Sequence, residues 1–213
     1  LDTIATIEVS GARTLMIRSG EGKMKMISIM NPLPAIDAWA VLSDGTVAIV
    51  RGHDYHVDWY HADGSHESTP KMPFDWRPLN DDAKKATLDS AQRQVDKMDS
   101  LMAAMAKSRG TSPQLASFVS VNALVKQSEL PDYVPPLRQY VPLRVDSDGN
   151  LWILPSTSSA ARGGSLYDVV NRRGEIIERV QLPAGRTLEG FGKNGMVYMS
   201  VPGVKLERAR IIR

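Results

Sequence analysis

Cysteine is absent from this chain of 213 residues. Its absence excludes disulfides, thiolate nucleophiles and zinc–thiolate sites, but it is compatible with oxidising and reducing compartments alike. An excess of one charge is lacking too, because 26 basic residues stand against 24 acidic ones and no run of five or six like charges occurs. We therefore expect no nucleic acid partner.

Long apolar runs are also missing from the sequence. No stretch approaches the ~18 apolar residues that predict a membrane-spanning helix, and the first residues do not combine a basic region with an apolar core. We expect no transmembrane segment, while peripheral association with a membrane complex stays open. The chain starts with "LDTIATIEVSG" rather than with methionine. We therefore expect it to be a piece of a longer polypeptide.

What the sequence does contain is a repeated pattern of two alternating apolar segments joined by a short turn with glycine. This pattern predicts a tight β-hairpin with a two-residue turn, since Asn, Asp and Gly tolerate positive φ. The clearest copies are residues 38–50, 142–154 and 188–201, with turns at Asp44-Gly45, Asp148-Gly149 and Asn194-Gly195. A second hairpin follows the first two copies, with turns at Asp63-Gly64 and near Arg173-Gly174. Each complete unit thus contains four short strands.

The spacing of these units is typical of a β-propeller with one insertion. Gly149 and Gly195 lie about one four-stranded blade apart, whereas Gly45 and Gly149 are separated by a longer stretch. Part of that stretch, residues 80–107, carries an apolar stripe that predicts a helix: Leu88, Ala91, Val95, Met98, Met102 and Met105. A second helix is predicted from Ser112-Pro113 through residue 125. We therefore predict one propeller-like domain over residues 1–213, with a helical insertion over residues 80–128.

The segments "VDSDGNLWIL" and "YHVDWYHADGS" resemble the blades of NHL-repeat and gluconolactonase-type six-bladed propellers. They are most similar to bacterial propeller-like proteins of exported type, and the resemblance covers residues 36–72 and 140–213. It implies an all-β fold, the C-terminal half of a propeller, and a periplasmic or otherwise extracytoplasmic location. Fold resemblance alone does not imply a function.

The number of predicted blades is too small for a closed ring. The chain offers about three four-stranded blades: two complete ones, a three-stranded last repeat over residues 187–212, and a single strand at residues 3–9. Propellers need about four to eight blades. Missing blades, a second copy or an open assembly against a partner would each resolve this. All three predict a partner surface, and we expect the exposed edges at residues 3–9 and in the last repeat.

All four histidines lie between residues 51 and 66, namely His53, His56, His61 and His66. A two-residue turn at Asp63-Gly64 places His61 opposite His66 on one face of the hairpin, and His56 with Asp58 on the other. The favoured interpretation is a solvated strand end. The alternatives are a metal ion bound by His61 and His66, or a pH-dependent contact. The sequence assigns no metal ligand, because no third ligand is evident on that face.

Other motifs give no catalytic or cofactor residue. The glycine of "DSDGN" falls one position early for a calcium loop, and "ARGGS" lacks the strand and helix of a phosphate site. No Gly-x-Ser-x-Gly sequence occurs. The metal-binding residues of gluconolactonase-type enzymes have no match here. We therefore expect no cofactor.

A methionine-rich hairpin over residues 14–30 is the remaining candidate surface. Its methionines, Met16, Met24, Met26 and Met30, suit either packing beneath a neighbouring blade or contact with another polypeptide. We interpret the chain as a non-catalytic interaction or scaffold subunit of a complex, which binds a protein partner or a second copy through its open edges and this hairpin. The alternative is part of a larger lactonase-like propeller enzyme or ligand-binding protein whose central site needs further blades.

Overall fold

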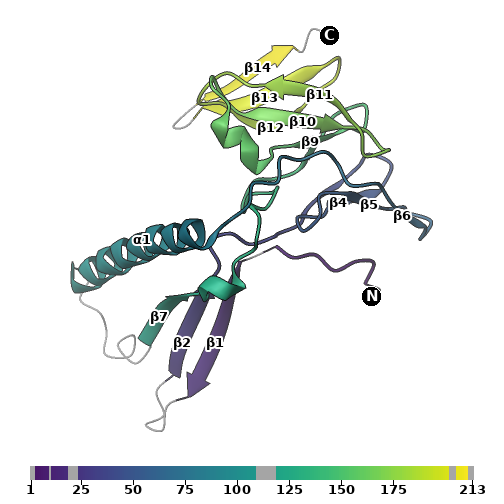
Figure 1. The fold of residues 1–213 in the computed structure, drawn as a ribbon. Helices are drawn as coiled ribbons and strands as arrows, with labels where there is room; N and C mark the ends of the chain where they lie inside the picture. Colours follow the sequence, from purple (N-terminus) through teal and green to yellow (C-terminus); the bar gives the residue numbers. More distant parts are fainter. Residues whose placement is uncertain (1–2, 10, 19–23, 109–118, 202–204, 211–213) are drawn as a thin grey trace. The chain divides into compact units, whose positions relative to one another are not determined.

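The structure of this protein is a computed structural model that describes residues 3–9, 11–18, 24–108, 119–201 and 205–210 (Figure 1). The chain divides into two compact units. The sheet unit consists of Leu1–Val9, Ala35–Trp76 and Pro135–Arg213, and the helix unit of Ser10–Pro34 and Arg77–Val134. The sequence pattern, which predicted one domain with an insertion at 80–128, gives no sign that residues 10–34 belong with the inserted helix.

The sheet unit contains three antiparallel sheets (Figure 1). Sheet I has four strands: β3 (Ala38–Val41), β4 (Val47–Val50), β5 (Val57–Tyr60) and β6 (His66–Ser68). Sheet II also has four: β8 (Arg144–Val145), β9 (Leu151–Ile153), β10 (Leu166–Val170) and β11 (Ile176–Gln181). Sheet III has three: β12 (Thr187–Phe191), β13 (Met196–Val201) and β14 (Lys205–Arg210). The described part of the chain is thus mostly β, built from small sheets in the order that the repeats predict.

The turns of sheets I and II differ from the prediction by one residue. The loop between β3 and β4 has three residues, because Leu42 N–H donates to the Thr46 carbonyl (2.8 Å) and Gly45 N–H donates to the Leu42 carbonyl (3.0 Å). Gly45 adopts φ +85, which favours glycine and completes a type I turn with a bulge. Asp44 stabilises this form by accepting the Thr46 N–H (3.0 Å). Two-residue turns were therefore wrong here, and the loops with Gly64, Gly149 and Gly174 repeat the same bonds.

Two apolar clusters hold the sheet unit together. The first lies between sheets I and II and includes Trp59, Leu151 and Val170, all at most 1% exposed. The second lies between sheets II and III and includes Trp152 and Leu188. Large and small side chains change places between the sheets: Trp59 lies opposite Ala48 in sheet I, while Trp152 lies opposite Val169 in sheet II. Each pair places one indole on the face that packs against the next sheet.

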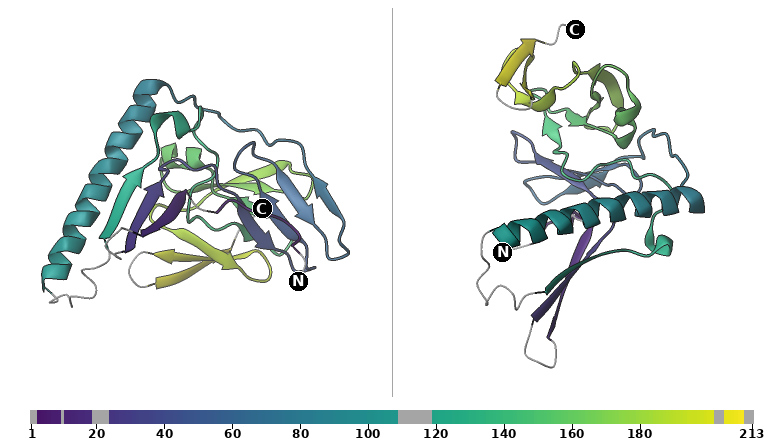
Figure 2. Two further views of the ribbon diagram at one scale, coloured as in Figure 1. Left: turned by 90° about the horizontal axis from the view of Figure 1, so that it is seen from below. Right: turned by 90° about the vertical axis from the view of Figure 1, so that its left-hand side faces the viewer.

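The helix unit contains α1 (Asp81–Ser108) and a three-stranded sheet of β1 (Ala12–Arg18), β2 (Met24–Met30) and β7 (Val119–Leu124), with η2 (Gln127–Glu129) following it. The helix prediction over residues 80–107 is confirmed. Its N-terminus is capped by Asn80, whose Oδ1 accepts the Ala83 N–H (2.8 Å). The helix lies next to β7, as Figure 2 shows. No helix in the described ranges is long and apolar enough to cross a membrane.

The second predicted helix is wrong where the structure describes it. Val119–Leu124 forms β7, which pairs in parallel with β2 from Lys25↔Val119 to Met30↔Leu124. β-branched valines at 119 and 121 suit an extended strand, and β2 offers it a free edge. Residues 112–118 lie outside the described residues.

Residues 3–9, predicted as a strand, are not part of any described sheet. They are held to the sheet unit by Asp37 and Arg51 instead. Asp37 N–H donates to the Glu8 carbonyl (2.6 Å), and Arg51 Nη1 donates to the Thr6 carbonyl (2.8 Å). One backbone bond and one side-chain bond thus replace the neighbouring strand that alternation alone implied.

Candidate functional site

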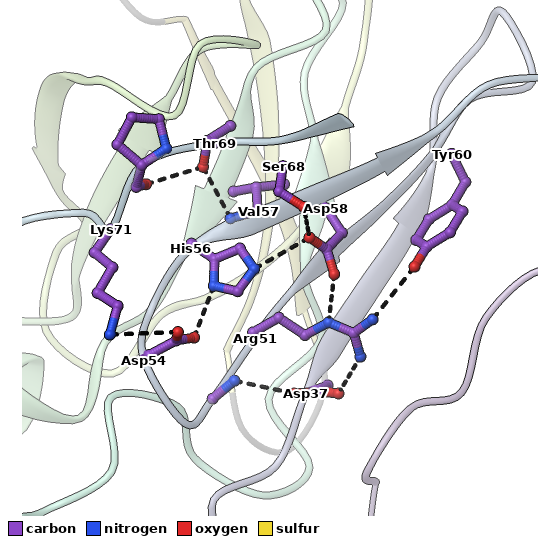
Figure 3. A network of polar contacts seen from close by, with 12 residues as sticks. Asp37, Arg51, Asp54, His56, Val57, Asp58, Tyr60, Ser68, Thr69 and Lys71 are labelled. Carbon is purple, nitrogen blue, oxygen red and sulfur yellow. Dashed lines mark hydrogen bonds and ion pairs between the residues drawn. The ribbon is translucent and has the colours of Figure 1, made fainter. Parts of the chain in front are cut away.

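A network of charged side chains lies along one face of sheet I (Figure 3). Its centre is the Asp58 carboxylate on β5, which is 7% exposed. Asp58 accepts hydrogen bonds from Arg51 Nε (2.7 Å), from the Ser68 hydroxyl (2.5 Å) and from His56 Nε2 (3.1 Å). Burial raises the pKa of Asp58, but the bonds from Ser68 and Arg51 outweigh burial and leave the pKa lowered. The carboxylate is therefore held in its charged form.

Arg51 connects this network to two other parts of the sheet unit. It lies directly after β4, and its Nη1 donates to Asp37 Oδ2 (2.8 Å) as well as to the carbonyl of Thr6 (2.8 Å). Burial lowers the pKa of Arg51, but the bonds to Asp58 and Asp37 raise it by more than burial lowers it. The pKa is raised overall, and the guanidinium stays charged. The planar fork of arginine suits this task, because it offers donors in fixed directions to several oxygens at once.

His56 lies between two carboxylates. Its Nδ1 is 2.7 Å from Asp54 Oδ1 and its Nε2 is 3.1 Å from Asp58 Oδ1. Neutral imidazole has one N–H, so only the imidazolium form donates both bonds. Lys71 Nζ lies 3.4 Å from Asp54 Oδ2. Burial raises the pKa of Asp54, but the bond from His56 and the charges of His56 and Lys71 lower it overall.

The arrangement does not provide a nucleophile next to a base. The Ser68 hydroxyl donates to Asp58, and both nitrogens of His56 face carboxylates rather than a hydroxyl. Serine–histidine chemistry needs the hydroxyl hydrogen-bonded to the imidazole. The network instead balances three carboxylates, Asp37 being the third, with cationic groups from neighbouring segments. Its direct effect is to fix β4, β5, β6 and residues 3–9 to one another.

Sheet II repeats the buried aspartate with different partners. Asp168 lies opposite Ile153 just as Asp58 lies opposite Ile49, and it is 4% exposed. Arg179 Nε on β11 donates to Asp168 (2.9 Å), and the hydroxyl of Tyr55, in the loop between β4 and β5, donates to it as well (3.4 Å). An aspartate near the start of the third strand recurs in both sheets, as the second residue of β5 and the third of β10, and this internal repeat is a sequence signal that could have located both aspartates.

The structure separates the two histidines that were predicted to face each other. The three-residue loop shifts the register, so His66 lies opposite Tyr60 and stacks on its ring at 5.8 Å, while His61 pairs with Ser65. The His61 ring contacts the Thr46 hydroxyl (3.3 Å) and lies 3.5 Å from a Glu67 oxygen. A shared ion at His61 and His66 does not fit this register. Within the described residues, no group of three or more His, Asp or Glu side chains is placed to hold a metal ion.

A pocket of about 570 Å³ lies between the first turns of sheets II and III. Acidic, aromatic and glycine-rich segments form it, with one lysine at its edge. Its lining residues are Asp146, Ser147, Asp148, Trp152, Phe191, Gly192, Lys193, Asn194, Gly195 and Met196. Asp146 holds the lining loop in place, because it accepts hydrogen bonds from the Trp152 indole N–H (3.1 Å) and from the backbone N–H groups of Asp148 and Asn150.

The helix unit carries an exposed apolar surface. All seven residues of β1 are exposed, including Leu15, Met16 and Ile17, and Met16 is 69% exposed. β1 is also the edge strand of its sheet. The apolar stripe of α1 is covered at Val95 but not towards the end of the helix, where Met98 and Met105 are exposed together with Leu101. Met16 of the predicted methionine-rich hairpin and Met98 and Met105 of α1 therefore stay largely exposed and are not packed beneath neighbouring segments.

Comparison with known proteins does not assign a family. No protein-family model matches the chain, and no curated protein matches it. A solved structure of a catalytically inactive virginiamycin B lyase from Staphylococcus aureus with quinupristin is similar at a TM-score of 0.33 and 10% identity. The likeness covers 96% of this chain and 59% of that chain. A similarity of this size supports no statement about activity.

Proposed function

We propose that this chain is a non-catalytic protein-binding subunit, in which propeller-like sheets form the scaffold and β1 forms the docking edge. The observation that carries the proposal is the full exposure of β1, an edge strand with three consecutive large apolar side chains. Soluble proteins protect such edges, because an unpaired apolar strand is a template for pairing with another chain. Addition of an extended segment to β1 would pair its backbone and cover these side chains.

The charges of β1 favour a partner other than a second copy. Arg13 and Arg18 flank the apolar centre of the strand, and Arg13 lies 3.1 Å from Glu129 at an exposed site. Antiparallel pairing of two copies about Leu15 and Met16 would place Arg13 opposite Arg18 at both ends, where like charges repel. A strand with an apolar centre and acidic ends fits better. The open edge of β14, which carries Lys205, Arg208 and Arg210, is a second basic edge of the same kind.

The absence of a nucleophile–base pair in the network of Figure 3 supports the non-catalytic part of the proposal. Every charged group described there has an oppositely charged or hydrogen-bonding neighbour within the protein. Such a network stabilises a fold and leaves little capacity for proton transfer to a substrate.

The test uses two synthetic nine-residue peptides with the same alternating apolar centre, one with glutamate ends and one with lysine ends. Fluorescence anisotropy should show saturable binding of the acidic peptide, at least about tenfold tighter than the basic one. Reversing the charges of β1 with Arg13→Glu and Arg18→Glu should invert this preference. The matched control, Arg208→Glu with Arg210→Glu on β14, should leave the preference at β1 unchanged. Equal binding of both peptides, or no binding of either, would contradict the proposal.

A further inference from the structure

A cavity of about 260 Å³ lies in the sheet unit, next to the buried aspartate of sheet II. Its lining comes from residues 73–75, from residues 155–161 around the 3-10 helix η3 (Ser156–Ala160), and from β10 and β11. All of these segments belong to the sheet unit. Pockets for drug-sized ligands measure about 300–1,000 Å³, so this cavity suits a smaller molecule.

One side of the cavity carries an arginine that a buried carboxylate holds in place. Asp168 is 4% exposed and accepts a hydrogen bond from Arg179 Nε (2.9 Å), and the two residues lie opposite each other on β10 and β11. The Arg179 side chain is 59% exposed, and within the described part of the chain its two Nη groups have no partner. The guanidinium is therefore fixed at Nε, while its outer edge presents donors in fixed directions.

The corresponding aspartate of sheet I has an arginine partner whose donors are all used. Arg51 donates from Nε to Asp58, as Arg179 does to Asp168, but its Nη1 also donates to Asp37. Its Nη2 lies 3.5 Å from the Tyr60 hydroxyl. Every nitrogen of that guanidinium thus has a neighbour in the protein. Arg179 repeats only the first of these bonds, so its outer edge is available to a ligand.

The cavity also carries an acidic side chain that is not bonded to this arginine. Asp75 is exposed and lines the cavity, and no ion pair among the described residues joins it to Arg179 or to another cation. Two hydroxyl groups complete the polar lining. Ser158, 7% exposed, accepts the Leu166 N–H (2.7 Å) and keeps its own proton for another acceptor, and Thr157 lines the cavity next to it. The lining thus offers donors to an anionic group and a carboxylate to a cationic one.

We propose that this cavity binds a small amino acid in its zwitterionic form, with the carboxylate on Arg179 and the ammonium group on Asp75. A carboxylate accepts two parallel bonds from the open edge of a guanidinium, which fixes its orientation. The half-buried Phe74 ring, which packs edge-on against Tyr55 (5.4 Å), and Pro155 supply an apolar wall. An apolar amino-acid side chain therefore fits better than a charged one. This site is separate from the docking edge at β1, so either proposal stands without the other.

Three forms of one amino acid test the two charged contacts on the full chain. They are leucine, leucine amide, which lacks the carboxylate, and N-acetyl-leucine, which lacks the ammonium group. NMR titration of the backbone amides should show saturable binding of leucine, at least about tenfold tighter than that of either derivative. Equal binding of leucine amide would show that the edge of Arg179 is not used, and equal binding of N-acetyl-leucine would show the same for Asp75. Either result, or absence of saturable leucine binding, overturns the proposal.

Two substitutions and one matched control test the location. Arg179→Lys keeps a positive charge for Asp168 but loses the planar fork, and it should weaken leucine binding at least about fivefold. Asp75→Asn removes a charge that has no bond to lose, and it should lower the affinity for leucine to that for N-acetyl-leucine. The control is Arg173→Lys, which makes the same change outside the cavity, at an exposed arginine paired with Glu175, and should leave leucine binding unchanged. Leucine binding that neither Arg179→Lys nor Asp75→Asn weakens would place the ligand elsewhere and refute the assignment.

Discussion

Replacement of Arg51 by methionine tests whether the network of sheet I stabilises the fold. The substitution keeps an apolar stem of similar reach and removes the guanidinium, which leaves Asp58 and Asp37 without their arginine partner. The Arg51 side chain is 21% exposed and that of Asp58 11%, so solvent screens this pair only weakly. Removal of one partner from a buried pair costs about 3–5 kcal/mol. We expect the lower end, about 3 kcal/mol, because Ser68 and His56 still donate to Asp58.

The measurement is urea unfolding followed by tryptophan fluorescence. All four tryptophans, Trp39, Trp59, Trp76 and Trp152, lie in the sheet unit, so the signal reports on that unit alone. The control is Arg172→Met, which removes a half-exposed ion pair with Asp44 and the contact of the guanidinium with the Trp59 ring, and it should cost clearly less than Arg51→Met. A further variant combines Arg51→Met with Asp58→Asn. The double variant should lose less stability than the sum of the two single losses, because Asp58→Asn removes the carboxylate charge that Arg51→Met leaves unpaired.

Two results would refute this reasoning. One is a loss for Arg51→Met that does not exceed the loss for Arg172→Met. The other is strict additivity of the Arg51 and Asp58 substitutions. Either would mean that the bonds in Figure 3 contribute no more than ordinary surface ion pairs.

Three further predictions concern pH, backbone packing and helix capping. Because the pKa of Asp58 is lowered in the folded protein, the contribution of its carboxylate to stability is present above the unfolded pKa of about 4 and is lost as the pH falls through the folded pKa. The cost of Arg51→Met in urea unfolding should therefore shrink between about pH 6 and about pH 3. A cost that stays constant over this range would contradict the prediction. Gly52→Ala should cost at least about 3 kcal/mol, since a Cβ there would lie 1.7 Å from a backbone carbonyl oxygen, whereas Gly190→Ala, with nothing within 4 Å, should be nearly neutral in the same assay. Asn80→Ala should destabilise the helix unit by about 1 kcal/mol while Asn80→Asp should not, as followed by circular dichroism at 222 nm during thermal unfolding; equal melting of the two variants would exclude a capping role.

The hairpins were predictable because their signal is local. Alternating apolar residues around an Asp-Gly or Asn-Gly pair predict two strands and a turn wherever they occur. The helix of residues 80–107 was predictable for the same reason, since one continuous segment contains its N-terminal capping residue, its apolar stripe and its full length. Local patterns do not fix the loop type, however. The extra residue in the four glycine loops of sheets I and II is accompanied by side-chain hydrogen bonds such as those that Asp44, Asp63 and Asp146 accept within their loops, and the one-residue shift in the second loop separated His61 from His66.

The candidate sites were not predictable, because their residues come from distant segments. Arg51 meets Asp37 and Thr6 only after the chain has folded back, and the sequence around each shows no motif. β7 illustrates the same limit: residues with mixed propensity formed a strand because β2 was available to pair with them. Such choices are decided by the free energy of tertiary contacts, which exceeds the small differences in intrinsic propensity.

The sequence by itself determined the position of the hairpins and of the long helix, because each depends on periodicity within a few turns or strands. Only the tertiary structure decided that residues 10–34 join the helix unit, that Arg172 of sheet II donates to Asp44 of sheet I, and that β1 keeps an exposed edge. The physical reason is that the exposure of a side chain and the pairing of a strand depend on contacts between segments far apart in the sequence. A local pattern of residues does not determine which of these segments come into contact.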